Sequence, residues 1–220
     1  FDGYFQNPKA TAETLEDGWM HTGDAGYLED DGQLVVLGRV SEVVYTNAGE
    51  RFIPTYIENR LKFSQYLKDA CVLGSERDFL AALIVIDLEA VGHWAEENGV
   101  AYTSFADLSQ KAPVQQLVRD EIRHVNTVLP DALQIRRFAN LHKEFDPDDG
   151  EVTRTRKLKR KVIDAHYAPI ITALYDGSEA IEFEATISYE TGESGTLKRH
   201  LTVSDVGTGN GARTQSEATK

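Results

Sequence analysis

Seven consecutive apolar residues, 80–86 (LAALIVI), constrain the fold more than any other part of this sequence. A run of this length without polar alternation is typical of a strand that is buried on both faces of a sheet. The run is too short to cross a membrane, and no apolar stretch in the chain reaches the ~18 residues that a spanning helix needs. We therefore expect residues 80–87 to form an interior strand of a sheet.

Helical periodicity is clearest over residues 113–129. Pro113 opens this segment, Val114, Val118 and Ile122 recur at helical spacing, and Pro130 ends it. Similar signals predict helices at 8–14, 54–68, 88–98, 103–110 and 160–175, and strands at 70–74 and 135–145. The sequence thus predicts a mixed α+β fold, with a central sheet flanked by helices in a domain of roughly 120 residues.

The two ends of the chain differ from this middle part. Residues 1–37 contain repeated Asp-Gly turn signals between apolar residues, which predict a small β-rich piece. Near the other end, two alternating segments within 181–203 flank a turn-rich stretch, which predicts a β-hairpin. We assign this hairpin to an appended unit at 176–206 and expect a disordered tail over 207–220.

Composition excludes several classes of protein. The formal net charge of -13 argues against nucleic acid or an anionic membrane surface as the main partner. The single cysteine, Cys71, lies in an apolar run, where a buried inert thiol is favoured over a nucleophile. With no disulfide framework and no signal peptide in its first residues, the chain is expected to be cytoplasmic. Because it starts inside a motif-bearing region without Met, we interpret it as a fragment of a longer protein.

The acidic turn at 146–150 (DPDDG) suggests a calcium loop. If Gly150 occupied the sixth position of such a loop, however, the first ligand would be Phe145 and the last Arg156. Neither residue is a suitable ligand, so no metal site is expected in this chain.

Three spaced motifs carry more information than any one of them alone. They are residues 18–27 (GWMHTGDAGY), 38–58 (GRVSEVVYTNAGERFIPTYIE) and 150–160 (GEVTRTRKLKR). Locally, the second motif is no more than a glycine-bounded hairpin carrying an arginine. Together and in this order, the motifs resemble the C-terminal part of the adenylate-forming superfamily, with the greatest resemblance to its long-chain fatty acyl-CoA synthetases. The resemblance covers about residues 1–175.

This resemblance implies a domain organisation and an activity. Residues 1–38 would be the β-rich end of a large N-terminal adenylation domain, and 39–175 would be the mobile C-terminal lid domain. The full-length protein would be an ATP-dependent long-chain fatty acid–CoA ligase that uses ATP, Mg²⁺ and coenzyme A. The phosphate-binding loop, the magnesium ligand and the acyl pocket would precede this chain, so the chain alone is expected to be inactive.

The resemblance also assigns residues to the adenylation step. Lys157 matches the catalytic lysine that bridges the carboxylate and the phosphate oxygens, whereas Arg154, Lys159 and Lys161 are expected to form a solvated basic face. Asp24 matches the carboxylate that binds the ribose hydroxyls of the nucleotide. Arg39 matches an arginine that reaches the ribose or phosphate, with an ion pair to Asp24 or Glu42 as the alternative.

The hinge and the thioester-forming surface follow the family pattern less well. By position the hinge is Ser41, where Asp or Lys is usual, with Glu42 as a neighbouring carboxylate. Tyr45 stands where the long-chain branch usually has Lys. The turn Asn47-Ala48-Gly49 would line the tunnel for the pantetheine arm of coenzyme A after rotation, because glycine permits close approach of the backbone.

Three alternatives stay open at this point. The enzyme could pass its acyl group to a carrier protein instead of coenzyme A. The chain could be a non-catalytic interaction domain that has kept the lid fold. The basic run 154–161 could bind nucleic acid, which the overall acidity disfavours. Peripheral membrane association, oligomeric state and acyl chain length are not defined by this sequence.

Overall fold

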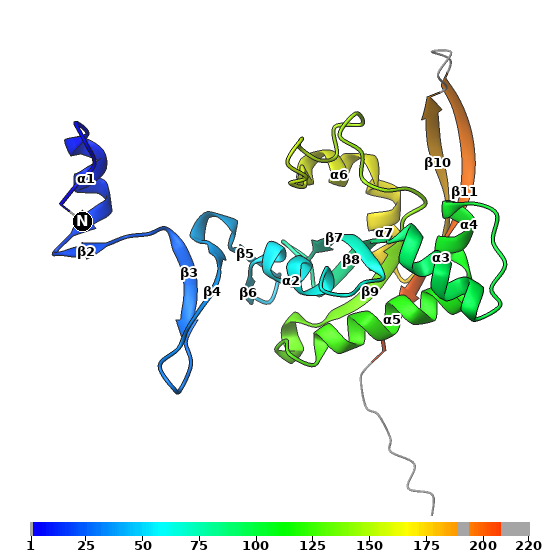
Figure 1. Ribbon diagram of the computed structural model, residues 1–220, viewed down its shortest axis with the longest axis horizontal. Helices are drawn as coiled ribbons and strands as arrows, with labels where there is room; N and C mark the ends of the chain where they lie inside the picture. The colour runs from blue at the N-terminus through cyan, green and yellow to red at the C-terminus, as the bar shows by residue number, and fades with distance from the viewer. Residues whose placement is uncertain (1, 189–193, 208–220) are drawn as a thin grey trace, which may run out of the picture.

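The computed structural model describes residues 2–188 and 194–207, so the predicted tail at 207–220 lies outside the described residues except for Gly207. The described part has a body of helices around one sheet, and a slender N-terminal segment extends from one end of that body (Figure 1). No helix in residues 2–188 and 194–207 is long and apolar enough to cross a membrane.

The central sheet has five strands in the spatial order β10-β11-β9-β8-β7. Its strands are β7 (Leu67–Leu73), β8 (Leu80–Ile86), β9 (Ile135–Asn140), β10 (Ala180–Ser188) and β11 (Ser194–Asp205). β8 and β9 run parallel, and every other neighbouring pair is antiparallel. The parallel pair requires a long crossover, and three helices of the body supply it.

Strand β8 is buried on both faces, as its uninterrupted apolar run predicts. Leu80, Ala82, Ile84 and Ile86 belong to one hydrophobic core, whereas the alternating Ala81, Leu83 and Val85 belong to a second. All seven side chains are 0% exposed. The prediction of an interior strand is confirmed, and the sheet separates two cores.

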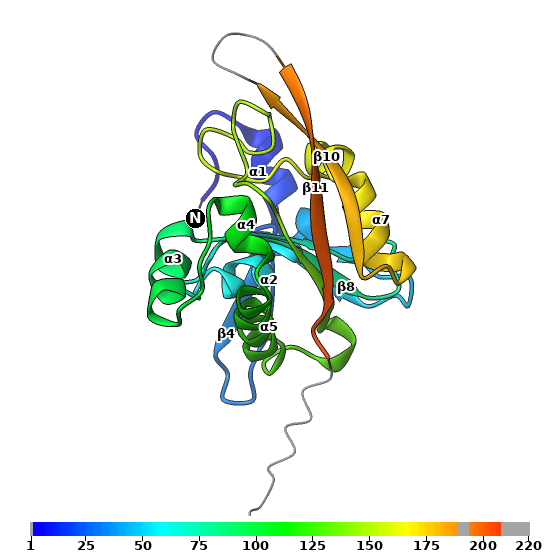
Figure 2. The same ribbon diagram turned by 90° about the vertical axis from the view of Figure 1, so that its right-hand side faces the viewer.

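Helices cover each face of the sheet and complete these cores (Figure 2). The first core takes apolar residues from α2 (Pro54–Leu61), α3 (Leu88–Glu97), α4 (Phe105–Gln110) and α5 (Ala112–Asn126). The second core takes them from α6 (Arg160–His166) and α7 (Ala168–Asp176). The mixed fold predicted from the sequence is therefore confirmed, with Val114, Val118 and Ile122 on the buried face of α5.

The predicted single helix at 160–175 is wrong, because the structure has α6 and α7 with a break at Tyr167. Pro169 causes the break, since it has no N–H to donate and its ring collides with the preceding helical turn. Proline is tolerated in the first turn of α7. The predicted strand at 135–145 is also shorter than expected, because β9 ends at Asn140.

The N-terminal segment is the small β-rich piece that the turn signals predict. It contains α1 (Pro8–Thr14), β1 (Leu15–Glu16), β2 (Trp19–Met20), β3 (Asp24–Leu28) and β4 (Leu34–Arg39). A 3₁₀ helix, η1 (Val40–Glu42), and a short pair, β5 (Val44–Tyr45) and β6 (Arg51–Phe52), then lead into the body. A second 3₁₀ helix, η2 (Asp131–Leu133), lies between α5 and β9.

The hairpin predicted within 181–203 is present as β10 and β11, and it extends the central sheet. β11 pairs with β9, with Val203 opposite Ala139, and the far end of the hairpin projects beyond the body (Figure 1). Buried Arg137 of β9 strengthens this junction: its Nη1 donates to Ala173 O at 2.9 Å, and its Nε lies 2.9 Å from the Asp205 carboxylate. The domain boundaries at 1–38, 39–175, 176–206 and 207–220 stay predictions.

Replacement of Arg137 tests how strongly the hairpin is joined to the body. We expect Arg137→Met to lower the free energy of unfolding by about 2–4 kcal/mol, because it leaves buried carbonyl groups without their charged donor. Arg136→Met is the matched control, since Arg136 is the exposed neighbour on the same strand. Chemical denaturation of the two variants measures the difference, and equal stability of the two would contradict this role.

Candidate functional site

Asp24 and Arg39, the two residues assigned to nucleotide binding, lie directly opposite each other on β3 and β4. Arg39 Nη1 is 3.1 Å from Asp24 Oδ1 and also donates to Thr22 O at 2.9 Å. Both side chains are largely accessible to solvent. The ion pair to Asp24, one of the alternatives for Arg39, is therefore present, and the nucleotide role of both residues stays a prediction.

The predicted hinge residues Ser41 and Glu42 lie in η1, directly after β4. Both are exposed. Gly38, just before them, has φ +152°, and a Cβ there would lie 3.1 Å from Ile53 Cγ2. Gly38 is the second-last residue of β4, and a single 3₁₀ turn follows the strand. The glycine permits backbone angles that other residues avoid. The hinge role itself stays a prediction.

The turn Asn47-Ala48-Gly49 is exposed and is attached to the body. Asn47 N–H donates to Arg77 O at 2.9 Å, and Asn47 Nδ2 donates to Asp78 Oδ1 at 2.8 Å. Gly49 has φ +83°, which glycine adopts without strain. This turn is therefore connected to the segment between β7 and β8, and its role in a coenzyme A tunnel stays a prediction.

A groove of about 1030 Å³ lies between the N-terminal strands and the body. Its lining includes Asp24 and Tyr27 from β3, Tyr45 from β5, Tyr56 from α2 and Leu129 near the end of α5. The structure thus brings Asp24 and the segment after the hinge to one groove, whereas Lys157 is not among the residues that line it.

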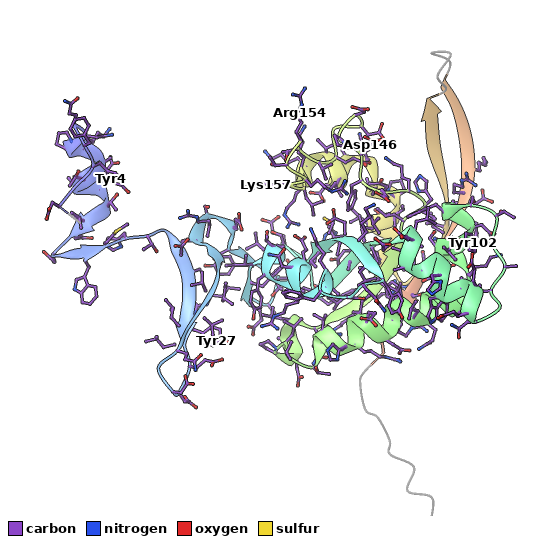
Figure 3. The ribbon with its side chains drawn as sticks, in the orientation of Figure 1. Tyr4, Tyr27, Tyr102, Asp146, Arg154 and Lys157 are labelled. Atoms are coloured by element: carbon purple, nitrogen blue, oxygen red, sulfur yellow. The ribbon has the colours of Figure 1, made fainter. Side chains whose placement is uncertain are left out.

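Lys157 lies in a tight loop between the acidic turn and α6, and its side chain is exposed. Both backbone polar groups of Lys157 form hydrogen bonds with Thr153. Lys157 N–H donates to Thr153 Oγ1 at 3.0 Å, and Lys157 O accepts from Thr153 N–H at 2.9 Å. Val152 and Leu158 pair as a β-bridge on either side. Along the long axis of the molecule, Lys157 lies on the side of this loop toward β3 and β4 (Figure 3).

The buried carboxylate of Glu151 holds this loop together. It accepts from Asp146 N–H at 3.0 Å and from Lys143 Nζ at 3.0 Å, and it lies 3.3 Å from His166 Nδ1. The backbone carbonyl of Glu151 accepts from Lys159 N–H at 2.8 Å, which closes the loop. Burial raises the pKa of Glu151, but the Asp146 amide and the Lys143 ammonium outweigh this effect and hold the pKa below its ordinary value.

Residues 2–188 and 194–207 contain no group of three or more His, Cys, Asp or Glu side chains placed to hold a metal ion. The acidic turn at 146–150 closes on its own backbone, where Gly150 N–H donates to Pro147 O at 3.0 Å. Cys71 is fully buried, and this burial raises the pKa of its thiol, as expected for an inert cysteine.

Sequence reasoning missed the residues that support the Lys157 loop, which are Thr153, Glu151, Glu58 and Arg160. Thr153 could have been found, because a threonine side chain in a turn often forms a hydrogen bond with a backbone group a few residues away. Glu58 was detectable as a carboxylate on the apolar face of α2, next to Ile57 and Leu61. Its partner could not be identified, because Arg160 is 102 residues away.

Comparison with known proteins agrees with this fold. A family model described as the AMP-binding enzyme C-terminal domain matches residues 41–179. The long-chain-fatty-acid–CoA ligase FadD15 of Mycobacterium tuberculosis is 36% identical over 177 residues, which cover 80% of this chain and 30% of the relative. The human long-chain-fatty-acid–CoA ligase ACSBG1 is 30% identical over 194 residues, with 80% of this chain and 27% of the relative covered.

A solved structure shares the fold as well. It is the adenylation domain of a carboxylate reductase from Mycobacterium chelonae, with a TM-score of 0.53 and 27% identity over 80% of this chain and 26% of that chain. The chain therefore belongs to the family of AMP-binding enzyme C-terminal domains. It spans about 30% of the length of the curated relatives, so it corresponds to their C-terminal part.

The Glu151 cluster makes the stability of the loop region sensitive to acid. A carboxylate with a lowered pKa stabilises the folded state above its ordinary pKa of about 4.5, and this stabilisation is lost as the pH falls through the lower folded value. We expect Glu151→Gln to lower the free energy of unfolding by about 1–3 kcal/mol at neutral pH. The difference from the unaltered protein should shrink below the ordinary pKa.

Asp148→Asn is the control, since Asp148 is an exposed carboxylate of the same turn. Urea denaturation at a series of pH values measures both variants. A deficit of Glu151→Gln that stayed constant across the acidic range would contradict the assignment.

Proposed function

We propose that this chain is the C-terminal part of an ATP-dependent long-chain fatty acid–CoA ligase. The observation that carries the proposal is the 36% identity to a long-chain-fatty-acid–CoA ligase across 80% of the chain. The exposed Lys157, on a loop fixed by Thr153 and Glu151, adds support, because such a cation could be delivered to a substrate bound outside the body.

In the first half-reaction, a carboxylate oxygen of the fatty acid attacks the α-phosphorus of ATP. The bond between that phosphorus and the bridging oxygen breaks, and pyrophosphate leaves with the electron pair, so that an acyl-adenylate is formed. Negative charge gathers on the phosphate oxygens and the carboxylate during this step. The Lys157 ammonium would bridge these oxygens and stabilise the transition state.

Asp24 and Arg39 would act on the nucleotide in the same step. The Asp24 carboxylate has two acceptor oxygens, which suit the two hydroxyls of a ribose. Its ion pair with Arg39 limits the charge that the approaching triphosphate meets. We assign ribose binding to Asp24, with Arg39 orienting its carboxylate.

In the second half-reaction, the sulfur of coenzyme A attacks the acyl carbon, AMP leaves, and the thiol proton is released. A rotation about Ser41 and Glu42 would bring the Asn47-Ala48-Gly49 turn to the place where the pantetheine arm enters. The open space around Gly49 suits such an approach. Apart from Gly49 and its two chain neighbours, no heavy atom of the described residues lies within 4 Å of a Cβ built there.

Substrates and location belong to the full-length protein. We propose ATP, coenzyme A and a fatty acid as substrates, with a cytoplasmic reaction. Mg²⁺ is expected from the family, and residues 2–188 and 194–207 offer no cluster of three or more His, Cys, Asp or Glu side chains to hold it.

Replacement of Lys157 tests the proposal in the full-length enzyme. We expect Lys157→Ala to slow fatty-acid-dependent ATP–pyrophosphate exchange by about 100–1000-fold, because the charge that stabilises the transition state is removed. Lys159→Ala is the matched control, since Lys159 is an exposed lysine of the same loop, and its exchange rate should stay within about twofold of the unaltered enzyme. An exchange rate for Lys157→Ala close to that of Lys159→Ala would favour a non-catalytic interaction domain instead.

A second candidate function is transfer of the acyl group to a carrier protein. Tyr45, which stands where the long-chain branch usually has Lys, favours it. Comparison of coenzyme A with a phosphopantetheinylated carrier protein as acceptor, in the full-length enzyme, separates the two candidates.

The chain alone should show no ligase activity, because the family resemblance assigns the phosphate-binding loop and the acyl pocket to an earlier part of the protein. Incubation of the purified 220-residue chain with ATP, Mg²⁺, coenzyme A and palmitate, followed by detection of AMP and acyl-CoA, measures this. Formation of acyl-CoA at a rate near that of the full-length enzyme would contradict the assignment.

A further inference from the structure

A buried ion pair joins α2 to α6. Glu58 of α2 is 5% exposed, and Arg160 Nη2 lies 2.8 Å from each of its two carboxylate oxygens. Arg160 is the first residue of α6. The pair is thus a close contact between helices that pack on opposite faces of the sheet.

The same two side chains bind the outer strand of the sheet. Glu58 Oε1 accepts from Val72 N–H at 2.8 Å, and Arg160 Nη1 donates to Val72 O at 3.3 Å. Val72 belongs to β7, which has no strand on its outer side among the described residues. The ion pair therefore satisfies both backbone groups of Val72 and fixes Arg160 against β7.

A second contact joins the Lys157 loop to β7. Arg156 Nη2 lies 3.8 Å from Oδ2 of Asp69, a buried carboxylate of that strand. Arg156 precedes Lys157, and Arg160 follows it by three residues. Lys157 is consequently bracketed by two arginines that both contact β7.

From this arrangement we propose that Glu58 and Arg160 are positioning residues, which set the place of the Lys157 ammonium for the adenylation step. The inference rests on the proposed function of Lys157. Arg160 fixes the end of the loop relative to α2, which begins four residues before Glu58. Only β6 and Ile53 separate the start of α2 from the turn at 46–50. The ion pair thereby keeps the lysine in register with the segment that carries the proposed hinge.

The chemistry of the pair suits positioning better than stabilisation alone. A buried ion pair gains little net stability over apolar packing, because both charges lose their hydration. A two-pronged arginine–carboxylate contact, in contrast, restricts direction as well as distance. Lysine cannot reproduce this fork, so Arg160→Lys keeps the charge while it loosens the geometry.

The test uses the full-length enzyme with Arg160→Lys and, separately, Glu58→Gln, which keeps the size of the side chain and an acceptor oxygen for Val72. ATP–pyrophosphate exchange reports adenylation. Conversion of supplied acyl-adenylate and coenzyme A to thioester reports the second half-reaction, in which the proposed mechanism gives Lys157 no part. Arg154→Lys is the matched control, since Arg154 is an exposed arginine of the same loop.

We expect Arg160→Lys and Glu58→Gln to slow adenylation by about 10–100-fold, because displacement of a catalytic group by about 1 Å has effects of this size. Thioester formation from acyl-adenylate and both reactions of Arg154→Lys should stay within about twofold. In a Lys157→Ala background, Arg160→Lys should cause no further loss of adenylation, since its effect acts through the lysine.

Equal losses in the two half-reactions, or the same fold loss with and without Lys157, would overturn the inference and make the pair structural. Loss of folding in both variants, seen by circular dichroism, would do the same. If Lys157→Ala itself left adenylation intact, the proposed function would fail first. If Lys157→Ala slowed adenylation while Arg160→Lys and Glu58→Gln left it unchanged, this inference would be wrong and the proposed function would stand.

Discussion

The burial of β8 on both faces is the constraint on which the rest of the structure depends. A strand whose seven side chains are all inaccessible cannot be covered by a single layer, so helices have to lie on each side of the sheet. The chain meets this demand with a crossover through α3, α4 and α5 on one face and with α6 and α7 on the other. The loop that carries Lys157 leads directly into that second layer.

Three of the buried charged groups among the described residues serve as connectors between elements. Arg137 joins β9 to the end of α7 and to β11, Glu151 closes the Lys157 loop, and Glu58 joins α2 to α6. Each is nearly inaccessible to solvent and each has an opposite charge beside it, as the cost of burying an isolated charge requires. These three buried charges thus lie at borders between the apolar layers.

Local pattern was sufficient to predict β8 from its uninterrupted apolar run. It was also sufficient to predict α5 and the hairpin, from the helical and the alternating periods of their apolar residues. It was insufficient at Tyr167, since the pattern of apolar residues continues across the break and only the missing N–H of Pro169 interrupts the helix. The motifs identified Asp24, Arg39 and Lys157 as candidates. The contact between Glu58 and Arg160 could not be predicted, because it depends on how two helices on opposite faces meet at the edge strand.

The bonds of the Asn47-Ala48-Gly49 turn have a mechanical consequence. Asn47 is tied to Arg77 and Asp78 beyond the end of β7, and the Lys157 loop is tied to the same strand through Arg156 and Arg160. A rotation about Ser41 or Glu42 would therefore move the turn and Lys157 together as a rigid body, so the distance between them would not change.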